Sequence, residues 1–171
     1  MQALRPPLSE IDLDTLEGGE TFLEIGVGGG ANLKRLQKKF SLVIGTDLNR
    51  DGGDGLRSAG ADLVLADRAN CFRASSFDAI AFNPPYLPSE KIVDRAVDGG
   101  SDGMQIPLEF LSSALKAIKP GGRILMLVSD LGSIHRLEEY CALRNLQAVL
   151  LVERKLFFET LFVYEIVDGK D

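Results

Sequence analysis

The sequence predicts an α/β fold whose mostly parallel sheet ends in an antiparallel hairpin. Short apolar runs alternate with segments of helical length, as in a doubly wound sheet. The runs show little alternation of polar and apolar residues, which is typical of parallel strands buried on both faces. The last two runs, within residues 146–167, leave no room for a crossover helix and must therefore pair antiparallel.

The predicted parallel strands point to one functional edge. They are expected at 21–26 (TFLEIG), 42–47 (LVIGTD), 62–66 (DLVLA), 77–82 (FDAIAF) and 123–129 (RILMLVS). Ligands of open α/β sheets bind outside the carboxyl ends of the strands, so the residues that follow each run are candidates for a site. The loop over 84–101 is long for a compact domain, and such loops are usually functional or mobile.

Two longer helices are expected between the later strands. One apolar stripe consists of Met104, Leu108, Leu111, Leu115 and Ile118. This spacing predicts a helix over 104–118, which Gly121 and Gly122 end. Asp130 is expected to cap a further helix that reaches about Asn145.

Composition limits the class of protein. The 171 residues suffice for one domain, which would bury roughly 70% of its unfolded surface. No apolar run approaches the about 20 residues of a membrane span, and the N-terminal stretch lacks the core of a signal peptide, so a cytoplasmic protein is expected. Cys71, Cys141 and the single histidine, His135, are too scattered to indicate a metal site. The net charge of −6 disfavours nucleic acid as a partner.

A glycine-rich loop follows the first strand. The stretch EIGVGGGAN (24–32) places glycines where the chain turns toward the first helix. Glycines let a ligand approach the backbone, and a helix N-terminus offers N–H groups and the positive end of the dipole. Asp47 lies twenty-one residues after Gly26, where an acid can accept hydrogen bonds from ribose hydroxyls. We therefore expect a cofactor that carries adenosine.

Two cofactors fit this loop. The pattern Gly26-x-Gly28-x-x-Ala31 is that of a dinucleotide fingerprint, whereas Glu24-x-Gly26-x-Gly28-x-Gly30 is that of an S-adenosyl-L-methionine site. Glu24 would repel a pyrophosphate but can interact with the methionine ammonium, so charge favours S-adenosylmethionine. The structural alternative is a turn that only packs the helix against the strand.

Further polar residues are expected at the same edge. Asp67 follows the third strand and can accept a hydrogen bond from an adenine amino group, with the backbone of Arg68 close by. The simpler interpretation of Asp67 is a solvated loop acid or a helix cap. The predicted convergence of Gly26, Asp47, Asp67 and Asn83 at strand ends is a stronger argument than any one of them.

The stretch FNPPYLP (82–88) has the residues needed to hold a planar amino group. An amide or aromatic amine nitrogen is a poor nucleophile because its lone pair is delocalised. The side-chain oxygen of Asn83 and the carbonyl of Pro84 can each accept one N–H and aim that lone pair at a methyl donor. Pro85 stiffens the loop, and Tyr86 can pack on the planar group. The alternative is a polyproline-like loop exit with a surface tyrosine.

The motifs EIGVGGG, TDLN, AD and FNPPYLP together resemble class I S-adenosylmethionine-dependent methyltransferases that modify planar amino groups. The stretches DGGSDG (98–103), KPGGRILMLVS (119–129) and RKLFFETLFVYEI (154–166) are similar to the archaeal and eukaryotic branch of the HemK-type protein glutamine N5-methyltransferases. The resemblance implies a seven-stranded Rossmann-like methyltransferase fold with strand order 3-2-1-4-5-7-6. It covers about 21–166 of a single domain over 1–171.

The resemblance also implies an activity and a site. The activity is N5-methylation of the glutamine in the Gly-Gly-Gln loop of a class 1 translation release factor. The resemblance implies cofactor contacts by Glu24, Gly26, Gly28, Gly30, Asp47, Asp67, Arg68 and Asn83. It makes Asn83, Pro84 and Tyr86 the residues that hold the substrate amide.

The resemblance further implies a partner protein, and the sequence departs from the family pattern in one place. Members commonly work with a small zinc-binding activator protein, and the strand order makes 62–66 an edge strand on which such a partner can pair. Members usually carry an upstream Tyr-x-Pro-x-Glu-Asp-Thr element that covers the cofactor, whereas LRPPLSEIDLDTL stands here. Residues 1–20 are therefore expected to form a shortened or altered lid.

Several alternatives remain open at the level of sequence. An N6-adenine or guanine-N2 methyltransferase acting on DNA or RNA would use the same Asn-Pro-Pro-Tyr chemistry. Methylation of a protein lysine is also open within the family, but the Asn-Pro-Pro-Tyr geometry suits a planar amide better than an ammonium. A cofactor-binding subunit without activity is a further alternative. His135 is expected at the surface, Glu159 as an edge carboxylate, and Phe157 and Phe158 in the core of the hairpin.

Overall fold

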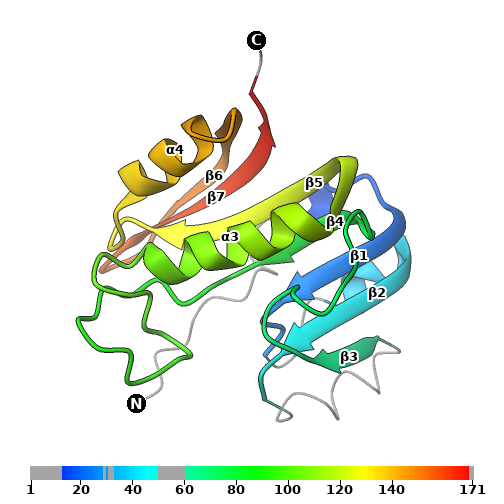
Figure 1. Ribbon diagram of the computed structural model, residues 1–171, viewed down its shortest axis with the longest axis horizontal. Helices are drawn as coiled ribbons and strands as arrows, with labels where there is room; N and C mark the ends of the chain where they lie inside the picture. Colours follow the sequence, from blue (N-terminus) through cyan, green and yellow to red (C-terminus); the bar gives the residue numbers. More distant parts are fainter. Residues whose placement is uncertain (1–12, 29, 31–32, 50–60, 170–171) are drawn as a thin grey trace.

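The computed structural model describes residues 13–28, 30, 33–49 and 61–169, and its centre is a seven-stranded sheet (Figure 1). The strand order is β3-β2-β1-β4-β5-β7-β6, as the resemblance implies. The strands are β1 (Gly19–Ile25), β2 (Phe40–Asp47), β3 (Asp62–Leu65), β4 (Phe77–Phe82), β5 (Ile118–Ser129), β6 (Leu146–Lys155) and β7 (Thr160–Asp168). All seven predicted strands are confirmed.

The strand directions place one common carboxyl edge along the sheet. β1 pairs in parallel with β2 and β4, and β2–β3 and β4–β5 are parallel as well. β7 runs antiparallel between β5 and β6, so the predicted final hairpin is confirmed. β5 begins earlier than expected, because Ile118 already pairs with Phe77 and the pairing shifts register before Ala79 meets Arg123.

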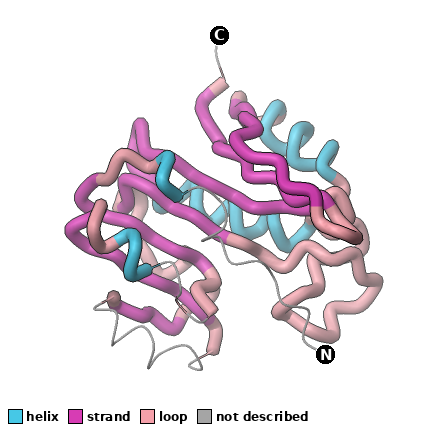
Figure 2. Tube along the Cα trace, turned by 180° about the vertical axis from the view of Figure 1, so that it is seen from behind, coloured by secondary structure: helices cyan, strands magenta, loops and turns pink. Residues whose placement is uncertain are grey.

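Helices cover both faces of the sheet. α3 (Gln105–Ala117) and α4 (Ile134–Ala142) lie over one face (Figure 1). Leu111 and Ala114 of α3 and Leu137 of α4 are fully buried there. The short helices η2 (Leu13–Thr15) and α1 (Leu33–Leu36) lie on the other face, as Figure 2 shows from behind. Within the described residues, no helix is long and apolar enough to cross a membrane.

The prediction that Asp130 caps the helix after β5 is wrong. α4 begins at Ile134, and no side chain caps its first turn by hydrogen bonding. Asp130 instead accepts a hydrogen bond from the backbone N–H of Thr160 at 2.8 Å, and its own N–H donates to the carbonyl of Thr160. The bond from Thr160 is the main cause that lowers the pKa of Asp130. Asp130 therefore fastens the start of β7 to the end of β5.

The prediction that Phe157 and Phe158 fill the hairpin core is also wrong. Their side chains are 91% and 85% exposed. They lie in the turn between β6 and β7, which the N–H of Leu156 closes by donating to the carbonyl of Glu159 at 2.8 Å. A turn that extends past the sheet has no opposite layer to pack against, so the period of the strands does not apply to it.

Asp78 organises the amino edge of the sheet at the start of β4. Its carboxylate accepts hydrogen bonds from the backbone N–H and the hydroxyl of Thr21, at 2.8 and 2.9 Å, and from Lys119 Nζ at 2.8 Å. These contacts join β1, β4 and the start of β5. The bond from Lys119 is the main cause that lowers the pKa of Asp78 from 3.8 to about 2.

We expect Asp78→Asn to lower the free energy of unfolding at pH 7 by about 1–2 kcal/mol, since the side chain is partly exposed. Because the folded-state pKa is depressed, the contribution of Asp78 is complete above its ordinary pKa of 3.8 and is lost as the pH falls toward 2. Urea denaturation of both proteins between pH 7 and pH 2 checks this. If both lose stability by the same amount on acidification, Asp78 is not the group responsible.

Candidate functional site

The sheet brings the predicted site residues to its carboxyl edge. Gly26 follows β1, Asp47 ends β2, Asp67 follows β3 and Asn83 follows β4. The backbone N–H of Gly26 donates to the carbonyl of Thr46 at 2.8 Å, and the backbone N–H of Ala66 donates to the backbone carbonyl of Asp47 at 3.0 Å. These bonds hold the turns after β1 and β3 against the end of β2.

The glycine loop adopts a backbone that favours glycine. Gly26, Gly28 and Gly30 have φ values of +73°, +50° and +71°, a region that residues with a side chain rarely adopt. The side chain of Val27 is buried and packs within 3.1 Å of the Cβ that a residue at Gly45 would carry. A Cβ on Gly28 would meet no atom of the described residues within 4 Å, so Val27 anchors the loop while Gly28 stays accessible.

The first helix is short in the part of the chain that the structure describes. α1 spans only Leu33–Leu36, and the preceding Ala31 and Asn32 lie outside the described residues. One turn of helix carries little macrodipole, and the N–H groups of Gly26, Gly28 and Gly30 already donate within the protein. The loop therefore serves a ligand mainly by allowing close approach to its backbone.

Asp47 is held where the prediction needs it. Its Oδ2 accepts the backbone N–H of Gly28 at 3.0 Å, and its Oδ1 accepts that of Asn49 at 2.9 Å. The carboxylate thus links the end of β2 to the glycine loop while it stays half-buried. A carboxylate fixed in this way can accept the two hydroxyls of a ribose at the mouth of the loop.

Glu24 is the second-last residue of β1. It is a buried acid and only 4% exposed. Its neighbours across the sheet are Gly45 of β2 and Ala81 of β4. Phe22 faces the same apolar cluster as Ala79 and Ala81, so alternation places Glu24 on that face too. Asn83 lies two residues beyond Ala81, which is about 7 Å along a strand. A buried carboxylate is costly, and such residues are usually kept for a function.

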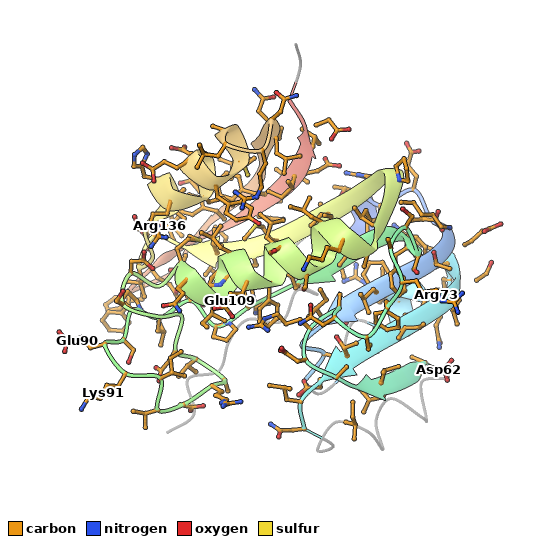
Figure 3. The ribbon with its side chains drawn as sticks, viewed as in Figure 1. Asp62, Arg73, Glu90, Lys91, Glu109 and Arg136 are labelled. Carbon is orange, nitrogen blue, oxygen red and sulfur yellow. The ribbon has the colours of Figure 1, made fainter. Side chains whose placement is uncertain are left out.

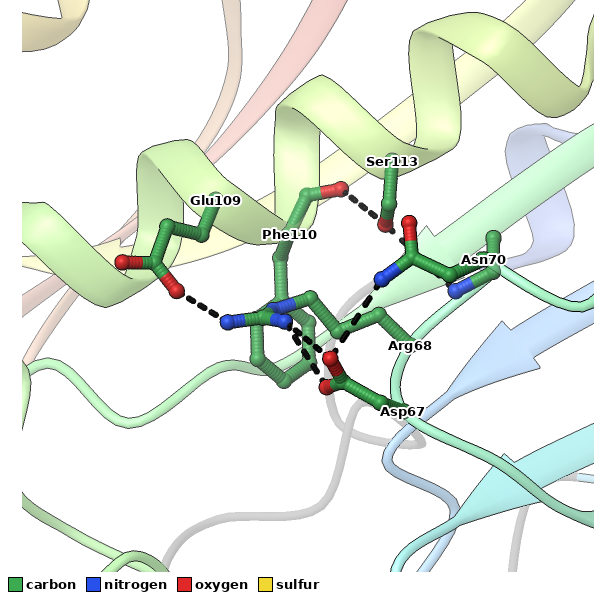
Figure 4. Close-up of polar contacts among 7 residues, drawn as sticks. Asp67, Arg68, Asn70, Glu109, Phe110 and Ser113 are labelled. Atoms are coloured by element: carbon green, nitrogen blue, oxygen red, sulfur yellow. Dashed lines mark hydrogen bonds and ion pairs between the residues drawn. The ribbon is translucent and has the colours of Figure 1, made fainter.

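Asp67 is engaged by a cluster that the sequence did not predict (Figure 4). Arg68 Nη1 donates to both carboxylate oxygens of Asp67, at 2.7 and 2.6 Å, and Asn70 Nδ2 donates at 3.3 Å. Arg68 Nη2 contacts Glu109 of α3, and the guanidinium lies 5.7 Å from the ring centre of Phe110. The side chain of Asp67 is still 52% exposed, so an amino group can reach it.

The same cluster borders the glycine loop. The ring of Phe110 lies 3.5 Å from the Cβ position of Gly26 and stacks obliquely with Phe82, 5.8 Å away between centroids. The side chains after β3 and on α3 therefore form one wall beside the turn after β1. Of the predicted roles, that of Asp67 toward adenine stays a prediction, and Phe110 is a wall residue that sequence reasoning missed.

The Asn-Pro-Pro-Tyr block leaves β4 as a firmly packed segment. Pro84, Pro85 and Tyr86 are buried and Asn83 is half-buried. The ring of Tyr86 lies in the apolar cluster on the α1 face and is 4% exposed, so little of it is open to a ligand. Packing of an acceptor group against this ring stays a prediction.

The DGGSDG segment supports this block from behind, which explains its glycines. Gly99 donates to the carbonyl of Leu87 at 2.7 Å, so the loop folds back along the block. A Cβ on Gly99 would lie 2.7 Å from the Cα of Tyr86, and one on Gly103 would lie 2.4 Å from its carbonyl oxygen. Glycines at 99 and 103 are required for this close approach. The cluster of glycines in DGGSDG was the sequence signal for this close backbone contact.

Gly103→Ala is expected to lower the free energy of unfolding by about 2–3 kcal/mol, because the new Cβ collides with backbone and φ is +69°. Gly121→Ala is the matched control, since its φ is +75° but no atom of the residues that the structure describes lies within 4 Å of its Cβ position. We expect about 1 kcal/mol there. Chemical denaturation measures both, and equal losses would mean that the contact with Tyr86 is unimportant.

Asp102 connects the DGGSDG segment to α3 and α4. Figure 3 shows Arg136 of α4 pointing toward this loop. Oδ1 of Asp102 accepts the backbone N–H groups of Met104 at 2.9 Å and of Gln105 at 3.1 Å, and Oδ2 contacts Arg136. Partial burial alone would raise the pKa of Asp102, but the bonds from Met104 and Arg136 outweigh it and lower that pKa. Asp102 thus caps the start of α3 and fixes the exit of the loop.

Comparison with known proteins finds relatives of this chain, but no protein-family model matches it. A release factor glutamine methyltransferase of Bradyrhizobium diazoefficiens is 32% identical over 124 residues, which cover 60% of this chain and 41% of the relative. A putative protein N5-glutamine methyltransferase of Methanocaldococcus jannaschii is 32% identical over 122 residues, 64% of this chain and 61% of the relative. The chain thus spans about two fifths to three fifths of these two relatives.

The structural neighbours agree with these relatives. A chain of the E. cuniculi Mtq2–Trm112 complex, described as responsible for methylation of the termination factor eRF1, has a TM-score of 0.78 and 25% identity. The match covers 95% of this chain and 92% of that one. In sequence and in fold, the chain is similar to these proteins. A 16S rRNA guanine-N2 methyltransferase of T. thermophilus, with a TM-score of 0.69, 21% identity and coverage of 99% of this chain and 41% of that one, shares the fold.

Within the described ranges, no group of three or more His, Cys, Asp or Glu side chains is placed to hold a metal ion. His135 is exposed on α4, where Glu138 and Glu139 lie one turn away, at 3.5 and 3.1 Å from its ring nitrogens. The expected surface position of His135 is confirmed.

Proposed function

We propose that this protein transfers a methyl group from S-adenosyl-L-methionine to the side-chain nitrogen of a glutamine. The acceptor is the glutamine of the Gly-Gly-Gln loop of a class 1 translation release factor. The observation that carries the proposal is the placement of Asn83 directly after β4, beside the strand that carries the buried Glu24 and next to a glycine loop that Asp47 fastens. The names of the relatives supply the acceptor.

The site residues fit the cofactor by charge and space. Glu24 would hold the methionine ammonium, Asp47 the ribose hydroxyls, and the open side of Gly28 lets the ligand approach the backbone. A pyrophosphate would face the buried carboxylate of Glu24, so a dinucleotide fits less well. When bound, the sulfonium supplies an electrophilic methyl group.

The chain's own contribution to the reaction is positioning. Asn83 through its side-chain oxygen and Pro84 through its carbonyl accept the two N–H groups of the amide, which fixes its plane and favours the positive charge that develops on nitrogen. Burial of Pro84 and Pro85, with Gly99 and Gly103 packed behind Tyr86, keeps these acceptors from moving. The nitrogen releases one proton to water after methylation, and no side-chain base is required.

The proposal includes a small activator protein that pairs with β3. β3 is the last strand of the sheet, and among the described residues no strand pairs with its outer edge. Leu65 of β3 is 48% exposed and Leu42 of β2 is 41% exposed, so this edge offers apolar surface. The E. cuniculi complex pairs Mtq2 with Trm112, which supports a partner of this kind. We propose that the activator, a small zinc-binding protein, docks there by strand addition.

Radiolabelled S-adenosylmethionine tests the acceptor class. The protein, with and without the activator, is incubated with a class 1 release factor, with its Gly-Gly-Gln→Gly-Gly-Ala variant, and with single-stranded RNA and DNA. We expect label on the unmodified release factor alone. Label that persists in the Gly-Gly-Ala variant would refute glutamine as the acceptor. Label on nucleic acid would favour the adenine or guanine alternative.

A further inference from the structure

The tip of the β6–β7 hairpin presents two phenylalanines to solvent. Phe157 and Phe158 are 91% and 85% exposed, and Leu156 beside them is 37% exposed. The two rings meet edge to face, with centroids 4.6 Å apart and an interplanar angle of 83°. A phenylalanine side chain carries about 150–250 Å² of surface, so this tip is a sizeable apolar projection.

The tip lies at the functional edge of the sheet. Leu161 of β7 pairs with Ser129, the last residue of β5, so the turn before it extends beyond the carboxyl end of β5. The hydroxyl of Ser129 donates to Glu159 Oε2 at 2.7 Å. The backbone N–H of Asp130 donates to the carbonyl of Thr160, and the N–H of Thr160 donates to Asp130 Oδ1. The tip is therefore fastened to β5 by side chains as well as by the ladder.

The same edge connects the tip to the segment behind Tyr86. The N–H of Ser133 donates to the carbonyl of Asp102 at 2.9 Å, and the Cβ position of Gly103 lies 3.0 Å from the Cα of Gly132. The stretch 129–133 thus bridges the hairpin tip and the loop over 84–103, which lie beside each other in Figure 1. Any macromolecule that brings an acceptor group to Asn83 approaches across this edge.

Local chemistry favours a protein rather than a nucleic acid as the molecule that covers the tip. Glu153, Arg154, Lys155 and Glu159 flank the phenylalanines with two charges of each sign, which creates no net positive field for phosphates. Exposed aromatic side chains on a rigid turn are typical anchors of protein interfaces.

We propose that Phe157 and Phe158 dock the folded protein that carries the acceptor glutamine, through an apolar patch on that protein next to its acceptor loop. This inference rests on the proposed function and adds a specificity element to it. A second exposed apolar pair, Ile92 and Val93, at 46% and 86%, stands on the loop over 84–103. That turn is ordered, because the N–H groups of Val93 and Asp94 donate to Asp98 Oδ2 at 2.7 and 2.8 Å. It supplies a further contact of the same kind.

The test is the double variant Phe157→Ser/Phe158→Ser, with Leu143→Ser as the matched control. Leu143 is 83% exposed but follows α4, before β6 begins at the opposite end of the sheet. With a class 1 release factor as substrate, the double variant is expected to raise KM about tenfold or more and to leave kcat within about twofold. The Kd of S-adenosylmethionine, measured by calorimetry, and all constants of Leu143→Ser should stay unchanged.

Each result separates this inference from the proposed function. An unchanged KM in the double variant, with an active wild type, overturns docking by the tip and leaves the proposed function intact. A lowered kcat or weakened cofactor binding with an unchanged KM overturns it as well, because the residues would then act on the site itself. A wild type that methylates only nucleic acid, with a KM that the double variant raises, shows a base-stacking tip instead. A wild type without activity on the release factor overturns both proposals.

Discussion

Asn83→Ala is expected to lower kcat for methyl transfer by about a hundredfold to a thousandfold, the size of effect seen when one oriented polar group is removed from a reacting centre. The Kd of S-adenosylmethionine should rise by less than about fivefold, because Glu24, Asp47 and the glycine loop remain. The physical reason is geometric: with one acceptor lost, the amide can rotate and its lone pair no longer faces the methyl group. Single-turnover kinetics with a saturating release factor measure this.

Two further variants make the result specific. Asn83→Asp keeps an oxygen acceptor at the same position, so it should recover part of the rate. Gln147→Ala removes an amide from the exposed part of β6, far from the carboxyl ends of β1 and β4, and should have no effect. Retained activity in Asn83→Ala would refute the role of this residue in holding the acceptor.

Glu24→Gln is expected to raise the Kd of S-adenosylmethionine about tenfold or more, since a hydrogen bond from a cation to a buried carboxylate is worth about 1.5–3 kcal/mol. The Kd of S-adenosylhomocysteine should rise by the same factor, because both ligands carry the ammonium and only one carries the sulfonium. Removing a buried charge should leave the free energy of unfolding unchanged or raise it. Calorimetric titration and denaturation measure the two effects.

Glu20→Gln is the matched control on the same strand. The side chain of Glu20 is 88% exposed at the amino end of β1, so its replacement should change neither Kd nor stability. A loss in Glu24→Gln that is confined to S-adenosylmethionine would place the carboxylate beside the sulfonium instead of the ammonium. Equal affinities in wild type and Glu24→Gln would remove Glu24 from the site.

The sheet was predictable because buried parallel strands are short apolar runs with few alternatives. TFLEIG and FDAIAF have no polar face, and the turn residues after them bound each strand closely. The convergence of Gly26, Asp47, Asp67 and Asn83 followed from topology alone, because parallel strands share one carboxyl edge. The hairpin was predictable because the chain between the last two strands is too short for a crossover helix.

Side-chain contacts between distant segments were not predictable in the same way. Asp130 has the residue type of a helix cap, yet the start of β7 supplies its partner. Arg68 binds both Asp67 and Glu109 because α3 packs beside the turn after β3, which no local pattern indicates. Phe157 and Phe158 follow an apolar run, but the turn carries them past the sheet. Each difference arises where tertiary placement decides the partner of a side chain.

The most direct test of the proposed chemistry is mass spectrometry of a class 1 release factor after incubation with this protein and S-adenosylmethionine. Fragmentation of the peptide that contains the Gly-Gly-Gln loop locates the added methyl group. We predict one methyl group on the side-chain nitrogen of that glutamine, and none when Asn83→Ala replaces the wild type. A methyl group on another residue of the release factor, or none in the presence of the activator, would contradict the account.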